Sequence, residues 1–102
     1  MAGECKHIFV GARSGAPGQI FSGVTFNDKY SRMEISVSDA EIQDIEVGVK
    51  YVNERGQSDF KLVSGRRSFS LDIATETQMS PVIQLKNKSD KAMRPQNCVD
   101  FR

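Results

Sequence analysis

The sequence predicts an all-β fold, an antiparallel and jelly-roll-like β-sandwich of about seven or eight short strands. Apolar and polar residues alternate in several segments, which is the period of a half-buried strand. Clusters of Gly, Asn, Asp and Ser separate these segments at intervals of about eight to twelve residues. The chain has 102 residues, the length of one domain, so a single sandwich domain is expected over residues 1–102.

The N-terminal part of the chain is expected to contribute two strands. Residues 5–10 form the first, with Ile8 and Val10 on one face. A loop rich in Gly, Ala, Ser and Pro follows over residues 11–18. Residues 20–26 form the second strand.

A third strand is expected over residues 30–37, after a turn at residues 27–29 whose Asn and Asp tolerate a left-handed backbone. Its alternation is the clearest in the chain. One face is apolar and the other carries Arg, Glu and Ser, as in a strand with one buried face. The apolar residues are Met33, Ile35 and Val37.

Residues 38–56 are the longest run with a continuous hydrophobic pattern, and two periods compete in it. In a strand, apolar residues would alternate at Ile45, Val47, Val49 and Tyr51. In a helix, Ser38 and Glu41 would form a capping box. One apolar stripe would then contain Ile42, Ile45, Val49 and Val52. That alternative is an α+β fold with one helix over residues 39–54.

Residue types favour the strand for this central stretch. Val47, Val49 and Tyr51 are β-branched or aromatic and suit a pleated surface. Gly48 would cost about 1 kcal/mol relative to Ala inside a helix. The strand is therefore the leading prediction, and the helix stays as the alternative.

Two further alternating segments follow a polar turn at residues 53–58. Phe60 alternates with charged residues, and Phe69 begins an alternation that continues to residue 73, so both phenylalanines are expected at core positions. Residues 64–67 look like a hairpin connection between these segments.

The C-terminal quarter is expected to be simpler. Residues 82–85 form a short apolar segment, residues 86–95 form a polar surface excursion, and residues 98–101 add a final edge strand. The excursion begins with Asn87, the first residue of an Asn-Lys-Ser glycosylation sequon.

Composition excludes some classes of function. Fourteen basic and thirteen acidic residues give a net charge of +1, so no overall field would attract nucleic acid or an anionic membrane. No run is long enough to span a membrane. The N-terminus lacks the basic start and apolar core of a signal peptide, which is consistent with a cytosolic chain, a mature form, or export by a route that the sequence does not show.

The two cysteines, Cys5 and Cys98, lie near opposite ends of the chain. They are either free thiols in a reducing compartment or one disulfide that joins the termini. In the chain-entropy description a loop of this length would stabilise the fold by roughly 4 to 5 kcal/mol. Clustered ligands of the kind that bind zinc are absent from the sequence, and no metal or cofactor is expected.

No catalytic residues are expected. His7 is the only histidine, and nothing in the sequence places a nucleophile or a carboxylate beside it. Arg66 and Arg67, with Lys61 nearby, form a small basic spot typical of a hairpin tip. The protein is therefore expected not to be an enzyme and not to bind nucleic acid.

The segment EISVSDAEIQDIEVGVKYV, with GQIFSGVTF before it, resembles jacalin-like lectins over about a third of the chain. Ile42, Ile45 and Val47, with Tyr51 one residue late, match that family's Ile-x-x-Ile-x-Val-x-x-Tyr strand. The family's glycine pairs and its Gly-to-Asp sugar-binding loop are absent, so none of its sugar contacts is carried over. In length and strand pattern the chain is similar to small β-sandwich hemagglutinins. The resemblance implies a β-rich protein that binds carbohydrate.

Two further resemblances imply binding to other molecules. AEIQDIEVGVKYVNERGQSDFKLVSGRRSF resembles the helix and following strand of the stefin type of cystatin, without that family's Gln-x-Val-x-Gly hairpin. GRRSFSLDI followed by VIQLKN resembles the end of a fungal β-sandwich necrosis toxin. The alternative function is therefore a protein-binding module, such as a cystatin-like protease inhibitor or a secreted effector.

The leading expectation for function is a lectin or hemagglutinin with a shallow site among loops at one end of the sandwich. Sugar hydroxyls need planar amides and carboxylates, and an aromatic face suits the apolar side of the ring. The expected partners are glycans or glycoproteins, and a homo-oligomer would raise the avidity of weak single sites. Two turns supply the candidate ligands, each of which is also a natural turn former. They are Asn27, Asp28, Tyr30, Asn53, Glu54 and Arg55.

Overall fold

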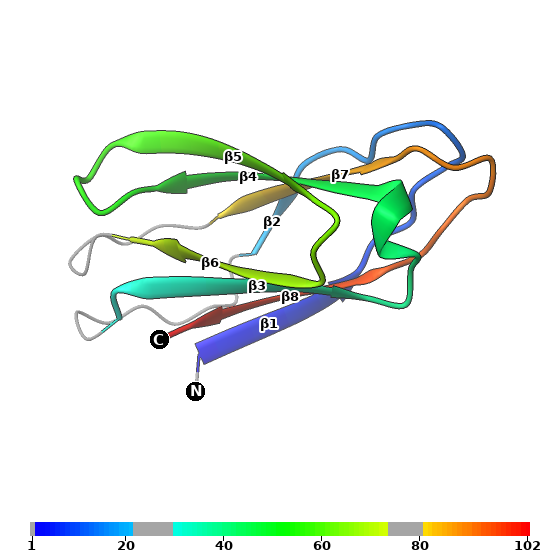
Figure 1. The fold of residues 1–102 in the computed structure, drawn as a ribbon. Coiled ribbons are helices and arrows are strands. Elements are labelled where there is room, and N and C mark those ends of the chain that lie inside the picture. Colours follow the sequence, from blue (N-terminus) through cyan, green and yellow to red (C-terminus); the bar gives the residue numbers. More distant parts are fainter. Residues whose placement is uncertain (1, 22–29, 74–80) are drawn as a thin grey trace.

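The computed structural model describes residues 2–21, 30–73 and 81–102, and within them eight strands form two antiparallel four-stranded sheets. The strands are β1 (Ala2–His7), β2 (Gln19–Ile20), β3 (Arg32–Ser38), β4 (Ile45–Val52), β5 (Ser58–Ser64), β6 (Ser68–Asp72), β7 (Val82–Asn87) and β8 (Gln96–Phe101). Sheet I has the order β1-β8-β3-β6 and sheet II the order β2-β7-β4-β5 (Figure 1). This is the strand order of a jelly roll, and the prediction of an all-β sandwich is confirmed.

The core lies between the two sheets and is built from alternating residues, as expected for strands with one buried face. Sheet I contributes Met33, Ile35 and Val37 from β3, Phe69 from β6, and Val99 and Phe101 from β8. Sheet II contributes Ile45, Val47, Val49 and Tyr51 from β4, with Ile83 and Leu85 from β7. The inward faces predicted for β3, β4 and β6 are therefore confirmed.

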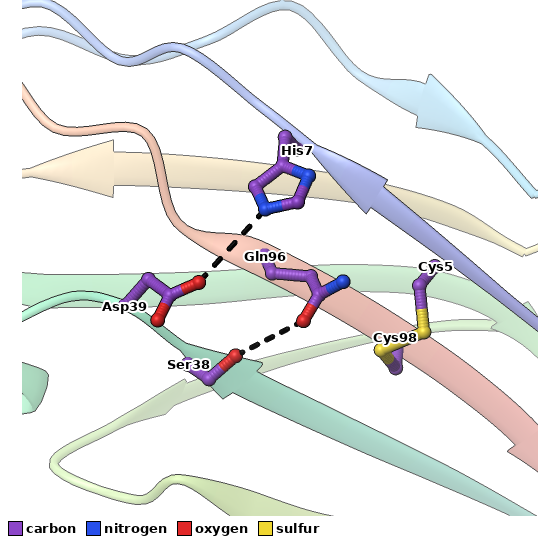
Figure 2. The surroundings of a disulfide bond; sticks show 6 residues. All are labelled: Cys5, His7, Ser38, Asp39, Gln96 and Cys98. Carbon is purple, nitrogen blue, oxygen red and sulfur yellow. Dashed lines mark hydrogen bonds and ion pairs between the residues drawn. A yellow bond between two sulfur atoms is a disulfide. The ribbon is translucent and has the colours of Figure 1, made fainter.

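The helix that was the alternative for the central stretch is wrong. A single 3-10 turn, Ile42–Asp44, separates β3 from β4. Ser38 ends β3, and its hydroxyl lies 3.4 Å from Oε1 of Gln96 instead of capping a helix (Figure 2). Glu41 precedes the 3-10 turn and makes no side-chain capping bond. Pairing of β4 with both β5 and β7 satisfies its backbone on two sides, which outweighs a local capping signal.

Two N-terminal predictions need correction. The first strand is β1, which starts three residues earlier than expected and ends at His7. Ile8 and Val10 lie beyond it, although both are buried. Within the described residues the second strand is Gln19–Ile20, and residues 22–26 of its predicted span lie outside the described residues.

Two C-terminal predictions are also wrong. The polar excursion does not begin at residue 86, because β7 continues to Asn87, whose side chain is fully buried. The final strand is not an edge strand, because β8 lies between β1 and β3. The sequence could not show this, since the partner on the outer side of β8 comes from the other end of the chain.

The pairing of β1 with β8 brings the two cysteines together. Cys5 and Cys98 are directly opposite in the register, with Cα atoms 4.1 Å apart, and they form a disulfide (Figure 2). The described residues contain no free cysteine. Of the two possibilities that the sequence left open, the structure has the disulfide, and the bond closes nearly the whole chain into one loop.

Two asparagines are fully buried, and their surroundings are opposite in kind. The Asn87 amide donates to the carbonyl oxygens of Gly11 (3.2 Å) and Lys91 (2.7 Å), and it accepts from the N–H of Ser89 (2.9 Å). Neither polar atom of the Asn97 amide has a hydrogen-bond partner within the described part of the chain. Asn87 therefore organises the loop after β7, and its burial argues against the sequon as a glycan acceptor.

Removal of the disulfide should weaken the fold strongly. The Cys5→Ser/Cys98→Ser variant should lose about 4 kcal/mol of unfolding free energy, because its unfolded chain is no longer restrained by a large loop. Chemical denaturation followed by circular dichroism measures the loss, and the reduced wild type should match the variant. Equal midpoints for oxidised wild type and variant would contradict the expectation.

The two buried asparagines should respond oppositely to leucine, whose side chain has the same branching. Asn87→Leu should destabilise by about 2 to 3 kcal/mol, because buried backbone groups lose their partners. Asn97→Leu should stabilise by about 1 kcal/mol, because an unpaired buried amide is replaced by an apolar group. Thermal unfolding of the pair is the measurement, and a fall in Tm for both variants would refute the difference inferred from their hydrogen bonds.

Candidate functional site

Strand β5 carries its large apolar side chains on the outer face of sheet II. Phe60 and Leu62 are 50% and 58% exposed. The prediction that Phe60 lies in the core is therefore wrong, whereas Phe69 is buried as predicted. The register explains the inversion. Val49 faces the core and pairs with Lys61, so the neighbours of Lys61 on either side must face outward.

A groove of about 540 Å³ lies on this outer face of sheet II. Its floor is at Gly48, where an added methyl carbon would lie 2.8 Å from Cζ of Phe60. Glycine therefore lets the aromatic ring lie close over β4, and a larger residue would make the ring shift. Phe60 and Leu62 form one wall, and the loop at residues 15–17 forms the other.

Polar side chains surround this apolar groove. Gln84 and Lys86 of β7 lie along it, and Glu46 of β4 stands between them and β5. The Glu46 carboxylate is 3.6 Å from Nζ of Lys88. An apolar floor with an amide, a carboxylate and ammonium groups at its rim can bind a flat, partly apolar ligand and orient its polar groups.

A second hollow, a polar cleft of about 310 Å³, lies between β5 and β6, the outer strands of the two sheets. It begins at the β4–β5 turn and is lined mainly by charged side chains. The lining residues are Tyr51, Asn53, Glu54, Arg55, Asp59, Lys61, Ser70, Leu71 and Asp72. Asp59 and Lys61 line this cleft because their side chains point inward from β5. They lie beyond the edge of the closely packed core.

The electrostatics of the polar cleft centre on Tyr51. Its hydroxyl lies 3.5 Å from Oδ2 of Asp59. Burial raises the pKa of Tyr51 above 10.0, and the negative charges of Asp59, Glu54 and Asp72 raise it further, because all of them disfavour a phenolate. The Tyr51 hydroxyl is therefore held in its neutral form and can both donate and accept a hydrogen bond.

The structure brings together three of the six sequence-predicted site residues. Asn53, Glu54 and Arg55 line the polar cleft. The Asn53 amide oxygen already accepts the N–H groups of Arg55 (2.9 Å) and Gln57 (3.1 Å), so half of its side chain maintains the turn. The side chains of Glu54 and Arg55 are exposed.

Of the other three predicted site residues, one lies apart from the polar cleft and two lie outside the described residues. Tyr30 stacks on Phe101, with ring centroids 6.0 Å apart, and packs against the core. Asn27 and Asp28 lie outside the described residues. The turn at Asn53 lies at the end of the sandwich where β3 begins, because Asn53 forms a bridge with Ile73, whose N–H donates to the carbonyl of Ser31 at 2.9 Å (Figure 1).

The groove on sheet II escaped the sequence analysis. Phe60 and Leu62 alternate like core residues, and a single strand does not reveal which of its faces is buried. One local signal was present. Gly48 sits inside a strand pattern, which often marks a close approach of another group.

The solitary histidine is placed at the surface. His7 ends β1, and its Nε2 is 3.8 Å from Oδ2 of Asp39 (Figure 2). Residues 2–21, 30–73 and 81–102 contain no group of three or more His, Cys, Asp or Glu residues that could hold a metal ion. Nor does this described part include a helix long and apolar enough to cross a membrane.

The sequence matches no protein-family model and no curated protein. Solved structures do share its fold. The Yersinia pseudotuberculosis-derived mitogen superposes with a TM-score of 0.67 at 7% identity, covering 98% of this chain and 86% of that one. The periplasmic inhibitor of g-type lysozyme from Aeromonas hydrophila gives 0.63 at 6% identity, covering 99% and 87%.

A third similar structure is the glycosylation-associated protein (Gap123) complex of Streptococcus agalactiae. It gives a TM-score of 0.57 at 11% identity, and the match covers 98% of this chain but 39% of that one. At these identities the similarity shows the small all-β fold. It extends over nearly the whole chain, so the two sheets described above are a recurring architecture.

The raised pKa of Tyr51 can be observed directly. Asp59→Asn removes one negative charge beside the phenol, so the pKa of Tyr51 should fall toward its ordinary value. The stability that the raised pKa contributes is fully present below pH 10.0 and is lost as the pH rises through the folded-state pKa. Alkaline titration of phenolate absorbance measures both proteins, with Tyr51→Phe as the control that isolates Tyr30. An unchanged titration in Asp59→Asn would contradict the role of that carboxylate.

Proposed function

We propose that the protein is a non-catalytic binding protein that recognises glycans at the groove on the outer face of sheet II. The observation that carries the proposal is the half-exposed Phe60 ring above Gly48, with Gln84 and Glu46 beside it. The apolar face of a sugar ring packs on an aromatic side chain. Its hydroxyl groups pair with planar amides and carboxylates. This groove is the hollow in which both kinds of group lie together.

The polar cleft offers a second region for glycan contact, the one that the sequence analysis favoured. Glu54 and Arg55 are exposed there, and Asn53 keeps its amide nitrogen for a ligand. The cleft presents no exposed aromatic face, because Tyr51 is buried. Contacts in the cleft would therefore depend on hydrogen bonds alone, and substitutions there should reduce affinity less than substitutions at Phe60.

A protein partner is the second candidate, and the apolar character of the groove favours it. Phe60 and Leu62 together expose the kind of surface that protein interfaces cover. One structure with the same fold is an inhibitor of g-type lysozyme. The cystatin-like form of this candidate depends on a helix over residues 39–54, and β4 occupies half of that span.

A glycan array read with purified protein tests the leading proposal. Phe60→Ala should reduce binding about tenfold or more, because it removes the aromatic platform. Gly48→Ala should also reduce it, since the new methyl group displaces the ring. Arg66→Ala, at the hairpin tip away from the groove residues, is the matched control and should bind as the wild type does. Absence of any bound glycan at high protein concentration would remove the lectin proposal.

Inhibition of g-type lysozyme in a cell-wall lysis assay tests the second candidate. Inhibition that disappears in Phe60→Ala, together with an empty glycan array, would favour a protein partner. Glycan binding without inhibition would favour the lectin. If Arg55→Ala abolishes glycan binding while Phe60→Ala preserves it, the binding site lies in the polar cleft instead of the groove.

A further inference from the structure

Strand β5 is one of the two outer strands of sheet II, and its free edge is accessible. Across the described residues it pairs with β4 alone, and five of its seven residues are exposed. An edge strand presents unpaired N–H and C=O groups that can accept another strand. Figure 1 shows β5 at the margin of the sandwich, beyond β4.

The hydrogen-bond pattern identifies which residues of β5 present backbone groups to that edge. The N–H of Asn53 donates to the carbonyl of Gln57 at 2.8 Å, and bonded pairs alternate along an antiparallel ladder. In this register the backbone of Lys61 is directed at β4 and that of Phe60 is directed away from it. A second observation agrees, because the N–H of Phe60 bonds to the Asp59 carboxylate at 2.8 Å instead of to β4.

The sequence Asp59-Phe60-Lys61 is complementary to itself when reversed. We propose that two copies of this chain associate through β5, antiparallel, with Phe60 opposite Phe60 of the second copy. The register then places Asp59 opposite Lys61 of the second copy, and Lys61 opposite Asp59. Opposite charges and aromatic pairs at directly facing positions both stabilise antiparallel strands. The backbone N–H and C=O groups of Phe60 also face the free edge. In this register they can therefore form the hydrogen bonds of an antiparallel pair.

Other arrangements of the same two strands are less favourable. A shift that centres the pair on Lys61 sets two ammonium groups directly opposite each other, and a parallel in-register pair does so as well. Charges that point inward on an edge strand usually protect it from pairing. Here they would disfavour the registers that set like charges opposite each other and favour the one that pairs Asp59 with Lys61, which is how specificity arises from repulsion.

Pairing requires a local exchange of partners at Asp59. In the single chain its carboxylate holds the N–H of Phe60. In the dimer that N–H donates to the carbonyl of Phe60 in the second copy, and the carboxylate turns to Lys61 of the second copy. The two sheets II become one continuous sheet, and their grooves lie on the same face, which would present two binding sites together. The association itself does not depend on what the grooves bind.

Light scattering after size exclusion tests the proposal, over about 10 µM to 1 mM protein. The wild type should approach twice the 11.4 kDa mass of one chain as its concentration rises. Asp59→Lys and Lys61→Asp should each remain single chains, because each sets like charges opposite each other. Mixing these two variants should restore the doubled mass, and the Asp59→Lys/Lys61→Asp double exchange should associate as the wild type does.

Cysteine cross-linking tests the register independently of charge. Phe60→Cys places two thiols opposite each other, with Cα atoms about 5.5 Å apart, within reach of a disulfide. It should yield a covalent dimer on oxidation. Leu62→Cys is the matched control, because its residue faces Ser58 of the second copy and should not cross-link. Peptide mapping confirms that the Cys5–Cys98 bond stays intact.

Two outcomes would overturn the proposal. One is a wild type that keeps the mass of a single chain up to the highest concentration. A second copy of the chain would then not be the partner of the β5 edge. The other is association that both single charge variants retain while Leu62→Cys cross-links as well as Phe60→Cys. If a charge variant fails to fold by circular dichroism, the cysteine pair decides. If the protein binds glycans but remains a single chain, the proposed function is supported and the proposed dimer is refuted.

Discussion

The pairing of β4 on both of its sides is the constraint on which the rest of the structure depends. β4 lies between β5 and β7, and its alternate residues Val47 and Val49 are fully buried. Once those residues face the core, the faces of both neighbours are determined, because directly opposite residues share a face. A shift of one residue would reverse every side chain of the sheet. Burial on one side therefore determines what the molecule exposes on the other.

Strand β5 shows the consequence most clearly. Taken alone, it would bury its phenylalanine and leucine. Pairing with β4 instead directs Asp59 and Lys61 inward and leaves Phe60 and Leu62 on the surface. The outer strand thus carries the residues of both hollows, polar on one side and apolar on the other. Both hollows follow from this inversion, and the free edge follows from the position of β5 at one end of the strand order of sheet II.

Closure of the sandwich depends on contacts between distant parts of the chain. β1 pairs with β8, and the Cys5–Cys98 disulfide joins the two strands covalently. The loop after β7 is held by the buried Asn87 amide, which also bonds the carbonyl of Gly11 in the loop after β1. These links tie the termini and the loops of one end to the middle of the fold. Sheet faces and loop ends are thereby held in place without any α-helix in the described residues.

The sequence by itself determined the fold class, the inward faces of β3, β4 and β6, and the position of the turn at Asn53. Strand period and turn chemistry are local properties, so residues close in the chain suffice to reveal them. The tertiary structure decided that Phe60 is exposed, that β8 is an interior strand, and that the cysteines are bonded. It also left Tyr30 outside the polar cleft that Asn53, Glu54 and Arg55 line. Each of these features depends on which distant strand pairs with a given strand. An alternating sequence pattern does not show which strand that is.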